Sequence, residues 1–479
     1  MSRKPRAALL LGGALLASSA LSLHAQVQPA ANVRASASTE AARTAFRSAL
    51  FEVQNVGGAR ADKHFQSAMA ADPQFGLARI YQTVVMPGLT PAEREARISE
   101  NLGGLGSAKP VELLLATYWR ETAAGRGAAA VPIIKAATEL APNDAEINYI
   151  YNNTQRAGKQ PAEAATILKS FLQRFPNHAA AYNTLAYTLW RTGDRAGSLA
   201  AVEKYVQLAS DHPNPHDSYA DILLLLGRGQ EAIAHVDHIR KLDPDWAFTD
   251  AKLGAIALTM NDVKGARGHF NTVLSRATEP GDRIDAAYWL ATTDLFAKDT
   301  KAAVQQITRV VDVAKGADLP GAVALAHDRL AVIQAYAGDK RSVTTHLAAA
   351  LAAAINDNQK ATHYGHAAIA LSRLGQADEA RAAATQAATL APNNPNVPVL
   401  DALLALDRKD FAAAEAAIAK APAMDVLPRA LRAELLIRTG KKAEGEALRK
   451  EVMSASVKQD GNPPVEFAAM VGRLRLAAM

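Results

Sequence analysis

Apolar side chains recur at helical spacing in two runs of the segment from Pro213 to Trp246. The first run consists of Tyr219, Ala220, Leu223 and Leu224, and the second of Ala232, Val236 and Ile239. Spacings of three and four residues place side chains on one face of an α-helix. Because Gly227-Arg228-Gly229 separates the runs and Pro244 follows them, the pattern predicts a helix, a turn, a second helix and a stop.

The same pattern returns along the chain with a period of 34 residues. A small residue recurs at this spacing in Ala130, Ala164, Ser198, Ala232 and Ala266. A turn-forming residue precedes each one, namely Gly125, Gly158, Gly193, Gly227 and Asn261. A period of this length indicates stacked helical hairpins, because a single hairpin cannot bury its apolar face without neighbours.

Small residues within each unit explain the periodicity. Ala232 is predicted to face Ala220 across the hairpin, where a small side chain allows two helix axes to approach closely. With the turn residues and closing prolines, these positions match the consensus of the tetratricopeptide repeat (TPR) family. The chain resembles this family over residues 42 to about 453, in the manner of an exported bacterial TPR array. The resemblance implies an all-α fold, a right-handed superhelical solenoid of about 11 to 12 hairpins.

The repeat register divides the chain. Repeats are expected to start at about Ala42, Val111, Ala145, Ala179, Pro213, Ala247, Ile284, Ala324, Ala361, Pro395 and Val426. Residues 76–110 form a degenerate repeat, whose second helix is predicted to begin with a capping box formed by Thr90 and Glu93. We therefore expect a signal peptide at 1–25, a flexible linker at 26–41, the solenoid at 42–453, and a tail at 454–479 with a possible capping helix.

The N-terminus is typical of an exported protein. Arg3, Lys4 and Arg6 precede an uncharged stretch that ends near the small residue Ala25, the pattern of a secretory signal peptide. The alternative of an uncleaved anchor is disfavoured, because spanning a bilayer takes about 20 continuous apolar residues and this stretch is interrupted by glycine and serine. We expect a periplasmic or secreted protein without a stable membrane span after cleavage.

Composition and charge exclude several classes of function. The chain contains no cysteine, so disulfides, thiolate metal sites and an N-terminal lipidated cysteine are excluded. Removal of the three basic residues of the signal lowers the formal net charge from +6 to +3. No basic stripe interleaved with aromatic residues is present, so nucleic acid is not an expected partner.

The sequence contains no established catalytic motif. It lacks a phosphate-binding loop, a zinc-protease motif, a nucleophile elbow and a dinucleotide fingerprint, so we predict no enzyme activity and no cofactor. Asp217 and Asp221 lie four residues apart on one predicted helix face, but such a pair more often lines a solvated groove than performs acid–base chemistry.

Histidine pairs are the remaining candidates for chemistry. The pairs are His212 with His216, His235 with His238, and His363 with His366. Pairs at this spacing can share a metal ion, but a site needs further ligands, and we predict no metal site. His235 and His238 flank the core positions Val236 and Ile239, so we expect them to point outward into solvent.

The family resemblance implies a binding surface on the concave side of the array. Carrying over the family's concave positions gives a predicted partner-binding groove of Tyr149, Asn153, Arg156, Asn183, Tyr187, Arg191, Asp217, Asp221 and Tyr288. The same positions include Glu146, Trp190, Asp285 and Phe296. The carboxylate clamp known in the family is not reproduced, because only Asn153 falls in place.

Two functions are consistent with this surface. The first is a non-catalytic exported scaffold that binds a protein or peptide partner in the groove. The alternative is a carbohydrate-handling role that accompanies polysaccharide assembly or export, with Tyr149, Tyr187, Trp190 and Tyr288 stacking on sugar rings. Exposure of these rings along the groove would distinguish the two.

Export predicts a defined mature N-terminus. Mass spectrometry of the protein from its native host should find a first residue near Gln26, because cleavage is expected after Ala25. Intact Met1 or Ser2 on soluble cytoplasmic protein would contradict export.

Overall fold

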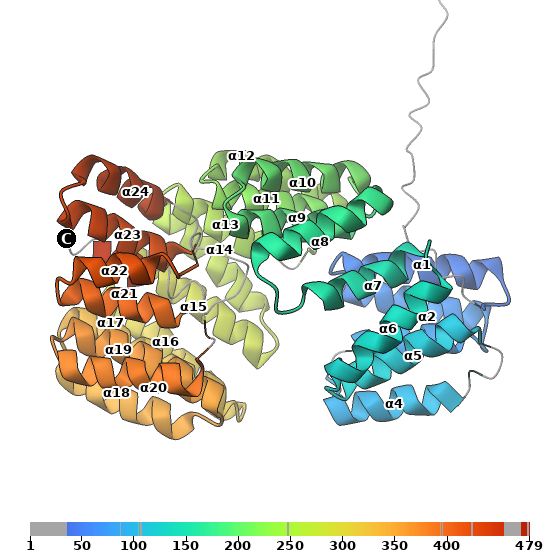
Figure 1. The fold of residues 1–479 in the computed structure, drawn as a ribbon, viewed down its shortest axis with the longest axis horizontal. Helices are drawn as coiled ribbons and strands as arrows, with labels where there is room; N and C mark the ends of the chain where they lie inside the picture. The colour runs from blue at the N-terminus through green and yellow to red at the C-terminus, as the bar shows by residue number, and fades with distance from the viewer. Residues whose placement is uncertain are drawn as a thin grey trace, which may run out of the picture.

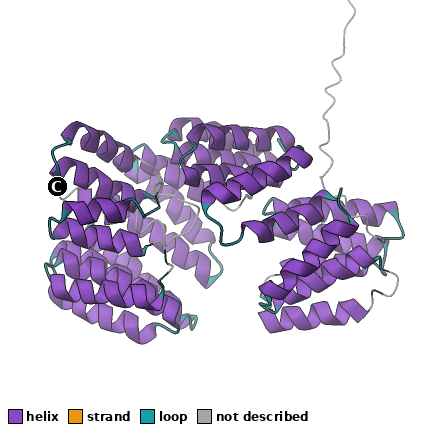
Figure 2. Ribbon diagram, viewed as in Figure 1, coloured by secondary structure: helices purple, strands orange, loops and turns teal. Residues whose placement is uncertain are grey.

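The chain folds entirely into helices and their connections over the residues that the structure describes (Figure 2). This computed structural model describes residues 36–454, except 87, 104, 106–107, 247–248, 393, 395 and 423–424, together with 471–476 and 479. The predicted signal peptide and most of the predicted linker lie outside the described residues. The described part contains no β-strand, and the prediction of an all-α solenoid is confirmed.

Helices α1 to α24 pair into consecutive hairpins, which follow one another from the blue to the red end of Figure 1. The first helices of the hairpins are α1 Glu40–Gln54, α3 Gly76–Val85, α5 Pro110–Ala123, α7 Ala145–Arg156, α9 Ala179–Thr192, α11 Pro213–Leu225, α13 Thr249–Thr259, α15 Pro280–Phe296, α17 Pro320–Ala337, α19 Asp357–Arg373, α21 Val397–Asp407 and α23 Val426–Arg438. The second helices are α2 Gly58–Ala71, α4 Pro91–Gly103, α6 Gly127–Leu140, α8 Pro161–Arg174, α10 Arg195–Leu208, α12 Gly229–Leu242, α14 Val263–Arg276, α16 Thr300–Gly316, α18 Lys340–Ala353, α20 Ala377–Leu390, α22 Phe411–Ile418 and α24 Lys442–Ser454.

The turn inside each hairpin needs a residue that tolerates left-handed backbone. Gly193 ends α9 with φ of 85°, where a side chain would be strained. Asn261 takes the equivalent place two hairpins later with φ of 60°, a conformation that asparagine tolerates better than most residues. The next residue, Asp194 or Asp262, then caps the second helix by accepting a backbone N–H at 2.8 Å.

Small side chains allow the paired helices to pack closely. Ala220 of α11 and Ala232 of α12 have no exposed surface and belong to one apolar cluster with Leu223, Leu224 and Val236. Larger neighbours interdigitate around these alanines, and their burial removes apolar surface from water. The same arrangement recurs at Ala380 of α20, which is also fully buried.

The weakest part of the sequence pattern also forms a hairpin. α4 begins with the predicted capping box: Glu93 accepts from the Thr90 backbone N–H at 2.8 Å, and Thr90 Oγ1 accepts from the Glu93 N–H at 3.3 Å. Ile80 and Ile98 are fully buried between α3, α4 and α5. Residues 76–103 therefore continue the stack although their consensus match is poor.

The C-terminal residues pack against the last hairpins. Residues 471–476 are helical, and Val471 and Leu476 are buried beside α23 and α24. The Arg475 guanidinium pairs with Glu434 and Asp407, which ties this helical turn to α23 and α21. Among the described residues, no helix combines the length and apolar character that crossing a bilayer requires.

The packing predicts a sharp dependence on side-chain size at the helix crossings. Ala232→Arg or Ala380→Arg should destabilise the protein by about 3 kcal/mol or more, through overpacking and burial of an unpaired charge. Thermal melts followed by circular dichroism measure the loss.

Each variant has a matched control on the same helix. Ala234 and Ala382 are exposed, so Ala234→Arg and Ala382→Arg should melt close to the parent. Equal melting of the buried and exposed variants would contradict the packing described above.

Candidate functional site

A cleft of about 780 Å³ opens on the side of the array formed by the first helices of successive hairpins. Its walls come from α9, α11, α13 and α15, from the α12–α13 connection, from the end of α14, and from the turn between α1 and α2. The lining residues are Val56, Asn183, Tyr187, Asn214, Asp217, Ser218, Asp245, Trp246, Asp250, Ala251, Val273, Arg276, Ala277, Asp282, Asp285 and Trp289. This volume lies in the range of roughly 300–1,000 Å³ that is usual for ligand sites.

The cleft is acidic although the chain as a whole is basic. Five aspartates line it, against the single basic residue Arg276, which is bound to Asp250 at 2.8 Å. Asp245, Asp282 and Asp285 are exposed. Loss of hydration next to the surrounding helices and repulsion from Asp282 raise the pKa of Asp285. The negative charge is therefore a local property of this surface and does not follow from composition.

A buried lysine lies behind the floor of the cleft. Lys252 of α13 has no exposed surface, and its Nζ lies 2.9 Å from Asp217 Oδ2 and 2.5 Å from Asp221 Oδ1. Tyr187 donates its hydroxyl to the other oxygen of Asp221 at 3.1 Å. One lysine nitrogen thus lies beside two aspartate side chains from the neighbouring first helix.

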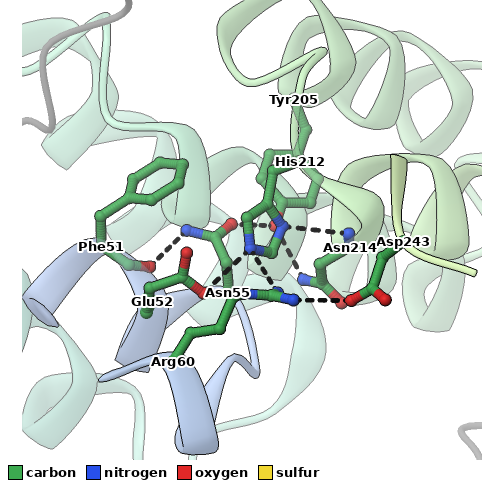
Figure 3. A network of polar contacts seen from close by, with 8 residues as sticks. All are labelled: Phe51, Glu52, Asn55, Arg60, Tyr205, His212, Asn214 and Asp243. Atoms are coloured by element: carbon green, nitrogen blue, oxygen red, sulfur yellow. Dashed lines mark hydrogen bonds and ion pairs between the residues drawn. The ribbon is translucent and has the colours of Figure 1, made fainter. Parts of the chain in front are cut away.

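The first hairpin reaches this site through a polar network, shown in Figure 3 and called the N-terminal clasp. It joins Glu52, Asn55 and Arg60 of the first hairpin to Tyr205, His212, Asn214 and Asp243, which lie between α10 and the end of α12. The clasp therefore joins segments that are about 150 to 183 residues apart in sequence.

Charge pairing and aromatic contacts hold the clasp together. Arg60 binds Glu52 and Asp243, each at 2.8 Å, and its guanidinium lies 5.4 Å from the ring centre of Trp246. His212 Nδ1 accepts from the Asn214 backbone N–H at 3.1 Å, and Nε2 lies 3.2 Å from Glu52 Oε2 and 3.0 Å from the Arg60 guanidinium. Burial disfavours the charge on Glu52, but the hydrogen bonds from His212 and Arg60 outweigh it and lower its pKa.

The clasp places an unusual residue at the cleft. Val56 follows Asn55 in the turn between α1 and α2, and it has φ of 62°, which is strained for a β-branched side chain. Its side chain is nevertheless 59% exposed and lines the cleft. The clasp thus supplies an apolar wall to a site that is otherwise built from repeats more than 100 residues away.

The nine predicted groove residues do not form one surface. Asn183, Tyr187 and Asp217 line the cleft, and Asp221 lies directly behind it on Lys252. Asn153 and Arg191 are exposed but do not line the cleft. Arg156 is half-buried, and its Nε donates to Asn152 Oδ1 at 3.0 Å.

Two of the predicted groove residues are buried between hairpins, so their prediction as an open binding surface is wrong. Tyr149 shares a hydrogen bond of 2.9 Å with Thr184 of the next hairpin. Tyr288 lies under the Arg329 guanidinium, which is 3.6 Å from its ring centre. Trp190 and Glu146, from the same family positions, are also buried.

The repeat period explains these corrections. Equivalent residues of neighbouring first helices lie side by side. Their polar groups therefore bind each other across the hairpin boundary and are not available to a ligand. Pairs of this kind, separated by 34 or 35 residues, are Tyr149 with Thr184, Tyr187 with Asp221, Asp217 with Lys252, and Asp328 with His363.

The histidine pairs are also placed differently from expectation. His235 and His238 are half-buried, because both pack against His216 of α11: the Nδ1 atoms of His216 and His235 lie 3.2 Å apart, and the rings of His216 and His238 are 4.1 Å apart. Burial lowers the pKa of His235 to about 4. His363 and His366 both lie beside the buried Asp328. Within the described residues, no group of three or more potential ligands has the arrangement of a metal site.

Several cleft residues were missed by the sequence analysis. Asp245 and Trp246 lie in a connection, Arg276 lies at the end of a second helix, and Val56 comes from the first hairpin. The family's concave positions lie only on first helices, so they cannot point to such residues. The sequence feature that could have indicated these residues is the group of acidic residues near the ends of three successive repeats.

Comparisons with known proteins find similar arrangements among solved structures. No family model matches the chain, and a search of curated proteins found no match. TTC0263, a thermophilic TPR protein of Thermus thermophilus, is 21% identical with a TM-score of 0.32, over 38% of this chain and 98% of that one.

Two further structures cover more of this chain. The Cut9–Hcn1 assembly of the APC/C is 13% identical with a TM-score of 0.38, over 85% of this chain and 75% of that one. A tetratricopeptide repeat protein from Parabacteroides merdae is 10% identical with a TM-score of 0.36, over 60% and 99%. These superpositions are loose, and the description as stacked helical hairpins rests on this chain's own period and packing.

The contact between α1 and α7 predicts a pH-dependent stability. Burial and repulsion from Asp144 raise the pKa of Glu146 to about 8, although Gln54 of α1 donates a hydrogen bond to it. Because this pKa exceeds the ordinary value of 4.5, ionisation opposes folding increasingly as the pH rises from about 4.5 to 8. The free energy of unfolding of Glu146→Gln should therefore exceed that of the parent by a larger margin at pH 8.5 than at pH 5. The difference between the two margins should be about 1 kcal/mol or more.

Thermal melts of Glu146→Gln and the parent across this range measure the effect. Glu163→Gln is the control, because Glu163 is exposed on α8 and should leave the pH profile unchanged. Parallel profiles for parent and Glu146→Gln would contradict the assigned ionisation.

Proposed function

We propose that this protein is a non-catalytic scaffold that binds a protein or peptide partner in the acidic cleft, and that it acts in the periplasm or outside the cell. The observation that carries the proposal is the cleft itself, which spans four consecutive first helices and presents the exposed side chains of Val56, Asp245, Asp282 and Asp285. A surface that continues over several repeats suits an extended segment of another chain.

The proposal of a scaffold is favoured over that of a carbohydrate-handling protein. Stacking on sugars needs exposed ring faces, but Tyr149, Trp190 and Tyr288 are buried between hairpins. Tyr187, the fourth residue considered, lines the cleft but is half-buried, with its hydroxyl bound to Asp221. Trp289 lines the cleft, yet one face of its ring is stacked on Phe270 with the centroids 4.8 Å apart. Aromatic side chains in these positions contribute mainly to packing.

The proposal of no catalysis follows from how the acidic residues are held. Asp217 and Asp221, the pair considered for acid–base chemistry, both lie against Lys252 Nζ, at 2.9 and 2.5 Å, so each has an oxygen engaged within the fold. Export is inferred from residues 1–25 alone, which resemble a cleavable signal.

Site-specific photo-crosslinking in cells of the native host tests the proposed binding surface. A photo-reactive residue replacing Asp245 or Asp282 should capture the same discrete partner, because both positions are exposed in the cleft. The same residue replacing Asp237, which is exposed on α12 but does not line the cleft, is the matched control. Adducts from Asp237 with none from the cleft positions would refute binding in the cleft.

A further inference from the structure

The chemistry of the cleft narrows the kind of partner that it accepts. Two buried oxygens that belong to its lining residues, Asn183 Oδ1 and Asp217 Oδ1, have no hydrogen-bond donor. Asp217 is only 8% exposed, and its other oxygen is bound to Lys252. A buried acceptor without a donor costs free energy and adds unbalanced negative potential next to the cleft.

The walls above these acceptors favour a cation. Asp245, Asp282 and Asp285 line the cleft around them and are exposed. An anionic ligand would be repelled by this surface, and a neutral one would leave its charges uncompensated.

The remaining walls are apolar or aromatic. Val56 presents an exposed aliphatic side chain, and Tyr187 and Trp289 contribute ring atoms. A long side chain with an aliphatic stem and a cationic head matches both kinds of wall. Arginine fits better than lysine, because its planar guanidinium offers five donors to several carboxylates.

We propose that the cleft binds an extended partner segment through arginine side chains, with the guanidinium groups donating to the exposed carboxylates of Asp245, Asp282 and Asp285. This inference rests on the proposed function and specifies the chemistry of the partner. The cleft volume of about 780 Å³ exceeds that of one side chain, so it accommodates several residues of the segment.

A peptide titration tests this specificity. The probe is a fluorescent nine-residue peptide in which arginine alternates with serine, and the matched probe replaces arginine with citrulline, which keeps the shape but removes the charge. Fluorescence anisotropy should show the arginine peptide binding at least about tenfold more tightly, with an affinity that falls as salt rises.

Two double variants locate the site. Asp282→Asn with Asp285→Asn should weaken the arginine peptide by about tenfold, because both carboxylates line the cleft. Asp237→Asn with Asp401→Asn removes the same charge from exposed positions elsewhere and should change the affinity less than about twofold.

Three results would overturn the proposal: equal affinity for the citrulline peptide, equal losses in the two double variants, or competition by spermidine as strong as that by unlabelled arginine peptide. None of them bears on the crosslinking experiment. A partner captured at Asp245 but not displaced by the arginine peptide would leave the scaffold function standing and reject only the arginine specificity.

Discussion

Close approach of paired helices at small side chains is the constraint on which the whole array depends. Ala232 and its equivalents set the distance between the two helices of a hairpin, and the period of 34 residues repeats that distance along the chain. Once the spacing is fixed, the first helices stand side by side, and their equivalent residues meet across each boundary. The polar contacts between hairpins and the walls of the cleft both follow from this stacking.

The same stacking decides which side chains are available for binding. Where two residues of adjacent hairpins can form a hydrogen bond, as Tyr149 and Thr184 do, both side chains stabilise the fold and are not available for binding. Where acidic side chains outnumber basic ones at a boundary, as with Lys252 between Asp217 and Asp221, the group lies next to the cleft. The acidic cleft lies where such an imbalance is joined by aspartates from helix ends and connections.

The fold was largely predictable from sequence, because apolar spacing, turn residues and capping residues act locally. The hairpin at 76–103 shows this well, since Thr90 and Glu93 mark its second helix although the consensus is weak. The site was predictable only in part. Asn183, Tyr187 and Asp217 were found from family positions, whereas Val56 reaches the cleft through long-range contacts that no repeat pattern encodes.

The N-terminal clasp changes how this array gains its stability. In a linear stack each repeat contacts only its neighbours, and a terminal hairpin can unfold alone. Here Arg60 is bound to Asp243, so the first hairpin is tied to the sixth. During synthesis these contacts must wait until α12 has been made, and their formation closes a loop of 183 residues. The first hairpin is therefore synthesised early but reaches its final stability only after α12 has been synthesised. The cleft wall formed by Val56 is also completed only then.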